Sequence, residues 1–277
     1  MRLRQLGSAR VSGLCIGGNP FSGFSHQTPE RSQQMREYHT VDRIHHVLAA
    51  AEAVGINTFF GRTDAHIFDI VRSYWQGGGR IQWFAQVCPA PGEPDSWRQW
   101  LDGAADVGAT GAYIHGGVID QWHASGAFAH CEEALARMRH HGLVAGFAGH
   151  RPAAHAWIRD HLEPDFQMCS HYNPTDRTQR AEHQAEGERW EESDRQAMLA
   201  LIPTLPRPVV HYKVFAGGNR PIEPAFALLG QCLRTDDVAC IGVFLQDDPE
   251  MLKRDAALFA QYVDRDPLTP ACGATAR

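Results

Sequence analysis

Short apolar runs alternate with longer amphipathic stretches along the chain, a pattern typical of β-strands that alternate with α-helices. The runs are rich in Val, Ile and Phe, and most end at a polar residue or a glycine. The predicted strands are Gly13–Gly18, Ile56–Phe60, Ile81–Val87, Gly111–His115, Val144–Ala148, Phe166–His171, Pro208–Phe215 and Ala239–Phe244.

The stretches between these strands predict helices. Val41–Val54 carries Ile44, Val47, Leu48 and Ala51 at helical spacing. We expect the last helix over Pro249–Val263, with Asp248 as its N-cap and Pro249 as its first residue. The other predicted helices are Glu132–His141 and Asp194–Ile202.

Eight strand-then-helix units predict an α/β fold, a closed (β/α)8 TIM barrel that forms a single domain over residues 1–277. A doubly wound open sheet is the alternative, but the glycine-rich segment at 17–23 lacks the spacing of a dinucleotide-binding loop. We expect an N-terminal hairpin over residues 1–13 and a frayed tail over 265–277. The polar segment Asp176–Asp194 predicts a lid over the active-site face, or else an ordinary solvated loop.

Composition narrows the range of partners. The 277 residues include 26 basic and 32 acidic side chains, and this mild acidity argues against nucleic-acid binding. No segment is apolar enough to span a membrane or to resemble a secretory signal, and the seven cysteines are scattered, as in reduced thiols. We therefore expect a soluble cytoplasmic protein that takes a small-molecule substrate. The oligomeric state stays open.

Histidine is abundant, and three of the 16 histidines end consecutive predicted strands: His115, His150 and His171. Barrel enzymes carry their sites at these strand ends. The three imidazoles, with Asp64 and His66 after the second strand, predict either a site for zinc, iron or manganese or a cluster of acid–base groups. The alternative is that each histidine only caps a strand or bonds a nearby carbonyl.

Further candidates lie in the same strands. Lys213, one of only two lysines, stands in an apolar strand, where burial would suit it to act as a base or form a Schiff base, unless it pairs with a carboxylate. Tyr113 precedes His115 by two residues and is a candidate proton donor, although packing at the rim is the alternative. Cys169 should face the same way as His171, as a ligand, a nucleophile or a core thiol.

A glycine-rich turn follows the seventh strand. Gly217 and Gly218 would allow the backbone to approach an anion, and Arg220 could bind a phosphate or a carboxylate. These three residues are the candidate cofactor-binding residues. A tight loop without a ligand explains the glycines equally well.

The motifs together resemble the aldo/keto reductase superfamily, whose members are (β/α)8 barrels that use NADPH. The similarity spans about residues 1–260 and is carried by loose motifs: RLRQLGSARVSGLCIGG, GINTFF, AYIHG, HHGLVAGFAGH, CSHYNP and Ile241–Phe259.

The resemblance carries over only part of the family's catalytic tetrad of Asp, Tyr, Lys and His. The family histidine corresponds to His115, whereas the lysine position is Gln86. The positions of the family's aspartate and tyrosine fall in FFGRTDAH, which has no tyrosine, so that His66 is the nearest candidate for the tyrosine's place.

The family's cofactor positions are changed as well. The Ser-Asn pair that holds the nicotinamide amide reads Gly149–His150, the strand-six glutamine reads Cys169, and His171 stands where the family has Glu. The phosphate-binding pattern near the last helix is not reproduced. The chain thus resembles a divergent member, and the resemblance implies the barrel while arguing against ordinary NADPH-dependent carbonyl reduction.

The leading hypothesis is therefore a non-classical enzyme that acts on a small polar carbonyl or hydroxyl compound, such as a sugar or a natural-product intermediate. Its chemistry would be that of a lyase, isomerase or hydrolase, with His115, His150 and His171 as metal ligands or acid–base groups. Lys213 would be a base or an electrostatic stabiliser, and Asp64 an orienting carboxylate. The alternatives are a divergent NADPH-dependent reductase in which His66 or Tyr113 replaces the missing tyrosine, and a non-catalytic barrel that binds a ligand or partner.

Overall fold

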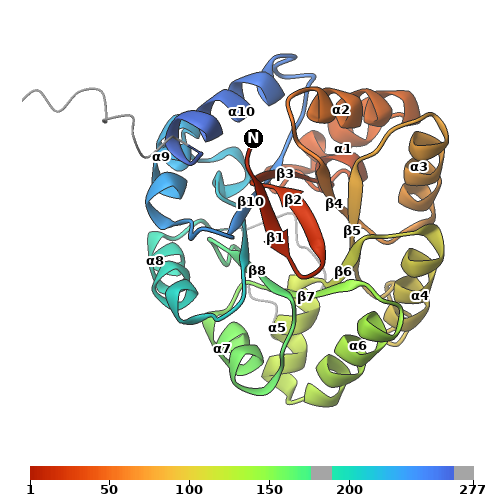
Figure 1. Ribbon diagram of the computed structural model, residues 1–277, viewed down its shortest axis with the longest axis vertical. Helices are drawn as coiled ribbons and strands as arrows, with labels where there is room; N and C mark the ends of the chain where they lie inside the picture. Colours follow the sequence, from red (N-terminus) through yellow and green to blue (C-terminus); the bar gives the residue numbers. More distant parts are fainter. Residues whose placement is uncertain (176–188, 265–277) are drawn as a thin grey trace, which may run out of the picture.

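Eight parallel strands close into a barrel, in the order β10-β3-β4-β5-β6-β7-β8-β9 (Figure 1). The computed structural model describes residues 1–175 and 189–264. Each strand expected from the sequence is present, and its ends differ from the prediction by at most three residues. The strands are β3 (Leu14–Gly17), β4 (Thr58–Arg62), β5 (Gln82–Val87), β6 (Gly111–Ile114), β7 (Val144–Gly149), β8 (Phe166–Ser170), β9 (Val209–Tyr212) and β10 (Val238–Gly242).

Helices surround the barrel and connect successive strands (Figure 1). They are α1 (Pro29–Tyr38), α2 (Val41–Ala53), α3 (Ala65–Gln76), α4 (Trp97–Val107), α5 (Gly116–Ser125), α6 (Phe128–His140), α7 (Pro152–His161), α8 (Glu192–Leu201), α9 (Ile222–Cys232) and α10 (Met251–Tyr262), with short 3-10 turns η1 (Pro20–Ser22), η2 (Ile202–Thr204) and η3 (Ala216–Gly218). The last helix begins two residues later than the sequence predicts, because the Asp248 carboxylate accepts the Glu250 N–H in a turn before it.

Helix α3 shows how the sequence builds one outer layer. The Asp64 side chain accepts the Ile67 backbone N–H at 2.8 Å and so caps the helix. Its buried residues, Ile67, Ile70, Val71 and Tyr74, recur at helical spacing and face the barrel.

The strands are buried on both faces, which gives the molecule two cores. In β4, Phe59 belongs to the large core between strands and helices, and Phe60 to the core inside the barrel. Aromatic rings fill the interior: Phe60 lies 5.0 Å from Phe84 between ring centroids, and Phe84 lies 5.8 Å from Phe166. The interior is thus packed, and any open space must lie at a barrel mouth.

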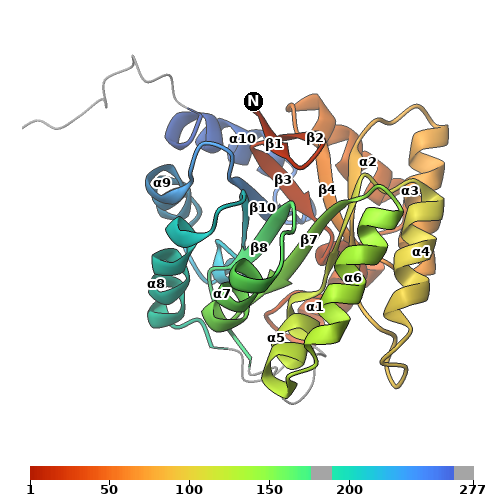
Figure 2. The ribbon, with the colours of Figure 1, turned by 60° about the horizontal axis from the view of Figure 1, so that its bottom comes forward.

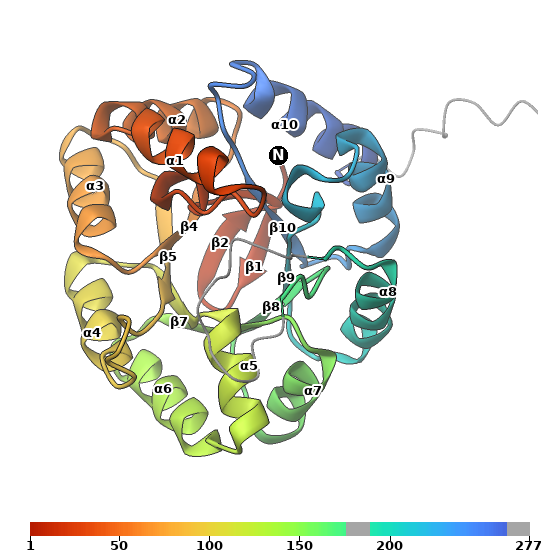
Figure 3. The ribbon, with the colours of Figure 1, turned by 180° about the vertical axis from the view of Figure 1, so that it is seen from behind.

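The N-terminal segment covers one mouth. Strands β1 (Leu3–Leu6) and β2 (Ala9–Ser12) pair antiparallel and lie across the barrel opening (Figure 1). Leu6 and Val11 are fully buried against the interior core. Figure 2 shows this hairpin at one end of the barrel and α1 at the other. The opposite mouth, seen in Figure 3, is formed by the carboxyl ends of the strands.

The expected lid, residues 176–194, lies mostly outside the described residues, as does the tail at 265–277; the last residues of the lid segment begin α8. None of the described helices is long and apolar enough to cross a membrane.

Candidate active site

A cavity of about 610 Å³ opens at the carboxyl ends of the strands, and we call it the C-terminal pocket. All eight barrel strands contribute residues to it, most of them at or just beyond the end of the strand. Those that bear on its chemistry are Asn19, His26, Phe60, Arg62, Gln86, Tyr113, His115, His150, Tyr212, Lys213 and Arg220.

Three side chains form a hydrogen-bonded chain that ends in the pocket. The carboxylate of Asp120, on α5, accepts the Nδ1–H of His150 at 2.8 Å, and His150 Nε2 lies 3.2 Å from the Tyr212 hydroxyl. Asp120 is fully buried and His150 is 4% exposed, whereas Tyr212 is half-buried and lines the pocket. The tyrosine hydroxyl is therefore the end of the Asp120–His150–Tyr212 chain that a ligand can reach.

Backbone donors hold the carboxylate in place. Asp120 also accepts the backbone N–H groups of His150 at 3.2 Å and of Arg151 at 3.3 Å. These bonds leave one orientation for the carboxylate, and its bond to Nδ1 sets the imidazole tautomer, with the proton on Nδ1 and the lone pair on Nε2. The geometry thus prepares His150 to interact with the phenol.

The first residue of α5 is a glycine because the Tyr212–His150 pair packs directly over it. A Cβ at Gly116 would lie 2.8 Å from the Tyr212 hydroxyl oxygen and 2.9 Å from His150 Cε1. The phenol consequently lies at the N-terminus of α5, where unpaired backbone N–H groups and the helix dipole favour negative charge. A phenolate formed at Tyr212 would be stabilised there.

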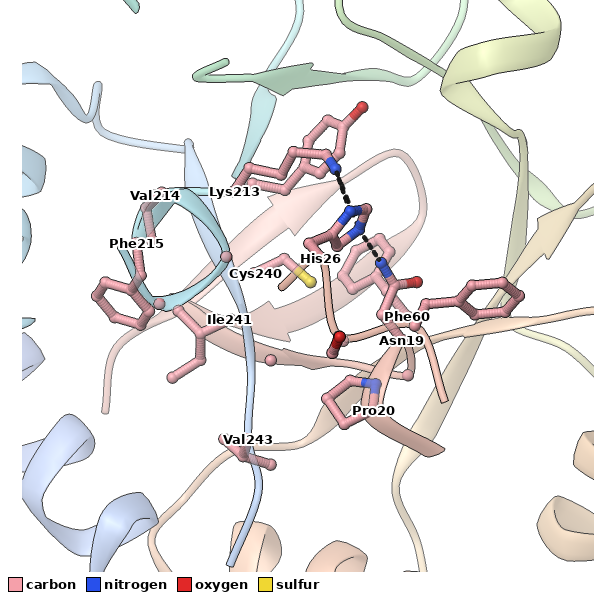
Figure 4. A pocket seen from close by; sticks show the side chains of 18 of the residues that line it. Asn19, Pro20, His26, Phe60, Lys213, Val214, Phe215, Cys240, Ile241 and Val243 are labelled. Atoms are coloured by element: carbon pink, nitrogen blue, oxygen red, sulfur yellow. Dashed lines mark hydrogen bonds between the residues drawn. The ribbon is translucent and has the colours of Figure 1, made fainter. Parts of the chain in front are cut away.

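A second polar group also lines the pocket (Figure 4). His26 Nε2 is 3.1 Å from Lys213 Nζ and 3.1 Å from Asn19 Nδ2. The Lys213 ammonium also lies 5.6 Å from the centre of the Trp190 ring. This arrangement places a cation at the pocket wall.

The expectation that Lys213 lies inside a strand is wrong. Strand β9 ends at Tyr212, and Lys213 takes a left-handed conformation (φ 57°) at the turn that follows. Period-two alternation would have directed Lys213 away from Tyr212, but the turn brings both side chains to the pocket.

Gln86, Tyr113 and His115 also line the pocket. Tyr113 is 1% exposed, and burial raises the pKa of its hydroxyl well above the ordinary value, while a hydrogen bond with Gln86 acts in the opposite direction. Its proton is therefore harder to remove than that of a solvated phenol. Tyr212, being more open to the pocket, is the better-placed proton donor.

Asp64 and His66 do not belong to the pocket-lining residues, so the roles expected for them are not met. Asp64 caps α3, and its second oxygen lies 3.9 Å from Arg62 Nε. His66 is exposed in the first turn of the same helix. The Asp64 carboxylate is thus engaged in capping the helix, and His66, in the first turn of that helix, points to solvent.

His171 does not join His115 and His150, which corrects the expected three-histidine metal site. His171 Nε2 is 3.0 Å from His211 Nδ1, and His211 Nε2 is 3.3 Å from the Asp237 carboxylate. Neither His171 nor His211 lines the pocket. Burial is the main factor that lowers the pKa of His171 well below its ordinary value.

Cys169 also lies away from the pocket. It is fully buried and packs with Met198 and Ile202 outside the barrel. Burial raises the pKa of its thiol well above the ordinary value, which is the behaviour of a core cysteine rather than a nucleophile.

The three candidate cofactor residues do line the pocket. Gly217 and Gly218 have positive φ angles of 61° and 90° and form the turn after Lys213. Arg220 is exposed at the rim, and its guanidinium donates to the Trp190 carbonyl at 3.2 Å.

Three residues of the site were not expected from the sequence: Asp120, His26 and Tyr212. A single acid in the apolar segment Gly116–Trp122 was a signal for Asp120, since an isolated buried carboxylate needs a partner. Alternation along β9 puts Tyr212 on the same face as Val210, but only the structure shows that this face is the barrel interior. No local pattern distinguishes His26.

Comparison with known proteins identifies the fold. No family model and no curated protein sequence matches the chain. Among solved structures, a Pseudomonas aeruginosa protein described as an aldo-keto reductase is 16% identical with a TM-score of 0.64, over 94% of this chain and 95% of that one. The holo form of aldo-keto reductase AKR11C1 from Bacillus halodurans is 17% identical (TM-score 0.61, 97% and 93% covered). An aldo/keto reductase from Brucella melitensis is 10% identical (TM-score 0.52, 94% and 93% covered).

The chain thus has the same (β/α)8 barrel fold as these structures along nearly its whole length, and the expected fold class is confirmed. At such low identity the likeness concerns the fold and not the chemistry of the pocket.

Proposed function

We propose that this chain is a nicotinamide-dependent oxidoreductase that interconverts a small polar carbonyl compound and its alcohol, with Tyr212 as the proton donor. The observation that carries the proposal is the Asp120–His150–Tyr212 chain, which places a hydrogen-bonded phenol at the pocket. Solved structures of the same fold are aldo-keto reductases, one of them a holo form, which favours this chemistry over others.

The pocket fits such a cofactor in size and in the charges that line it. Its volume of about 610 Å³ is typical of small-molecule and cofactor sites, which span roughly 300–1,000 Å³. Lys213 and Arg220 line the pocket beside the glycine turn of Gly217 and Gly218, where the backbone can approach an anion closely. We assign phosphate binding to these two cations.

A bound reduced nicotinamide would supply the hydride, and the protein's own groups would supply the proton. Tyr212 donates its phenolic proton to the substrate oxygen, and the resulting phenolate lies at the N-terminus of α5. When His150 is protonated, its Nε2 proton passes to the phenolate, while Asp120 keeps its bond to Nδ1. Asp120 stabilises the imidazolium and so makes Tyr212 a stronger acid.

The cofactor-free alternative is an isomerase or lyase, and one observation favours it. Besides Tyr212, the pocket contains a second acid–base pair, Lys213 and His26. Two such groups could remove a proton from one carbon of a substrate and return it to another. A metal-dependent isomerase or lyase is not favoured, because His171, one of the three expected metal ligands, lies outside the pocket.

The test has two parts. The untagged protein is titrated with NADPH and with NADH, and binding is monitored by tryptophan fluorescence. Oxidation of the cofactor is then measured with a panel of small sugars and hydroxycarbonyls as substrates. We expect saturable binding and carbonyl-dependent oxidation of the cofactor. Arg220→Ala should weaken cofactor binding about tenfold or more, while Arg72→Ala on the exposed face of α3 should not. No binding at millimolar cofactor would overturn the proposal, and cofactor-free turnover would establish the alternative.

A further inference from the structure

Outside the pocket, three metal-ligating side chains converge between the barrel wall and the helix layer. They are His171, which follows β8, His211 on β9 and Cys232, the last residue of α9. Each offers one ligand atom, and the three atoms all lie within 4.8 Å of one another. Figure 3 shows α8 and α9 side by side outside these strands. Among residues 1–175 and 189–264, this is the one such grouping of three His, Cys or acidic side chains.

We propose that His171, His211 and Cys232 form a zinc-binding site. Two imidazoles and a thiolate are a common zinc ligand set, completed by water or another ligand in a tetrahedral arrangement. His171 Nε2 and His211 Nδ1 are 3.0 Å apart. Two nitrogens on a tetrahedral zinc lie about 3.3 Å apart, so a small opening of the pair would admit the ion.

The surroundings of His211 are those of a metal-bound imidazole. Its Nε2 lies 3.3 Å from the Asp237 carboxylate, which leaves the Nδ1 lone pair directed at His171. Asp237 is held in turn by Arg234, whose Nε and Nη2 donate to it at 2.8 Å, and by the Val209 N–H at 2.8 Å. A carboxylate behind the ligating histidine orients the ring and strengthens its binding to the metal.

His171 is buried where it meets the other two ligands. Its side chain is 1% exposed, and its Nε2 is the nitrogen that bonds His211 Nδ1. A zinc ion ligated by this Nε2 would replace that bond, and Nδ1, on the other edge of the ring, would lie outside the site.

The site is independent of the proposed oxidoreductase activity, because none of its three ligands lines the C-terminal pocket. Bound zinc would tie the loop after β8 to β9 and to the end of α9. Its role would then be to stabilise the wall of the barrel rather than to act on substrate.

The experiment is titration of untagged, metal-stripped protein with Zn²⁺ in competition with a chromophoric chelator, and with Co²⁺ as a spectroscopic probe. We expect one Zn²⁺ per chain, a rise in Tm, and a cobalt spectrum with a thiolate charge-transfer band and tetrahedral visible bands. Cys232→Ser should abolish the charge-transfer band and weaken Zn²⁺ binding at least tenfold. Cys131→Ser, which changes a buried cysteine on α6, should leave both unchanged.

Tyr212→Phe should leave zinc binding unchanged, which separates this site from the pocket. Absence of stoichiometric Zn²⁺ binding by the wild-type chain would overturn the inference. Equal Zn²⁺ affinity and an equal cobalt spectrum in Cys232→Ser would overturn it as well.

Discussion

Asp120 is the residue that determines how strongly His150 can support the pocket phenol. It is fully buried, and its carboxylate accepts two backbone N–H groups besides the imidazole Nδ1–H. Its negative charge stabilises the protonated imidazole, and that imidazole stabilises a phenolate at Tyr212. In the proposed mechanism Asp120 is thus a positioning residue, which acts on the substrate only through His150 and Tyr212.

Replacing Asp120 by Asn keeps the shape and removes the charge. We expect turnover to fall about 10- to 100-fold, and the pH at which reduction is half-maximal to move down, because His150 loses the charge that favours its protonation. The measurement is the pH profile of kcat/KM.

Asp165→Asn is the matched control for this change. Its carboxylate accepts the Ala145 N–H at 2.8 Å, in the loop before β8 and away from the pocket. It should lower stability without moving the profile. An unchanged profile in Asp120→Asn would contradict the role given to Asp120.

At the scale of elements, each barrel strand brings one side chain to the interior and the next to the helix layer. This alternation explains why His150 and Tyr212 meet while His171 does not join them. Val210 and Tyr212 of β9 face inward, whereas His211 between them lies with His171 outside. A shift of one position along a strand therefore moves a histidine side chain from the pocket to the outer side of the barrel wall.

Asp64 caps helix α3 and does not line the pocket. We expect Asp64→Ala to lower the free energy of unfolding by about 0.5–2 kcal/mol, because the Ile67 N–H loses its cap. Cofactor binding and turnover should stay within about twofold of wild type. Urea denaturation and steady-state kinetics check both expectations.

Asp69→Ala, an exposed change on the same helix, should alter neither stability nor activity. A loss of turnover in Asp64→Ala, with the fold intact, would instead place Asp64 in the catalytic machinery.

On the scale of the whole molecule, buried neutral histidines make the fold sensitive to acid. His155 is fully buried, with Nδ1 2.7 Å from Gln167 Oε1 and Nε2 3.2 Å from the Gly149 carbonyl. Burial is the main factor that lowers its pKa. Below an unfolded-state pKa of about 6.5, the unfolded chain binds a proton at this residue that the folded chain resists.

Stability should therefore fall as the pH drops below about 6.5, by up to about 1.4 kcal/mol per pH unit from this residue. His155→Gln should remove this pH-dependent contribution. The difference in free energy of unfolding between variant and wild type should therefore be smaller at pH 5 than at pH 7. Urea midpoints at the two pH values measure it. A constant difference would show that His155 titrates alike in both states.

Most of the barrel could be predicted from the sequence, because each strand is a short apolar run bounded by polar or glycine residues. The exact start of α10 could not be predicted. Asp248 and Pro249 are also favourable turn residues, and in the structure they form a turn before the helix. Helix α6 begins at Phe128, four residues before the predicted start, with no side-chain cap to announce it.

The site was predicted less completely, for a physical reason. Parallel strands are apolar on both faces, so the sequence does not reveal which face of Phe166–Ser170 points inward, and His171 was assigned to the wrong side. His26 comes from a loop that only the closed barrel brings to the pocket, and Asp120 comes from a helix that the barrel packs behind His150. His115 and His150 were expected at the site because each stands at a strand end, and Arg220 because it follows a glycine-rich turn. Lys213 was expected there for a different reason, as a lysine inside an apolar strand, and it reaches the pocket from the turn after that strand.

In the proposed mechanism Tyr212, supported by His150 and Asp120, donates the proton in the C-terminal pocket. The most direct measurement compares Tyr212→Phe with wild type for both cofactor affinity and carbonyl reduction. We predict affinity within about threefold of wild type and a fall in kcat of about 10²- to 10⁴-fold, the usual contribution of a general acid. Tyr262→Phe, whose hydroxyl bonds Glu223 on the outer surface, should retain full activity. Undiminished kcat in Tyr212→Phe would contradict the claim.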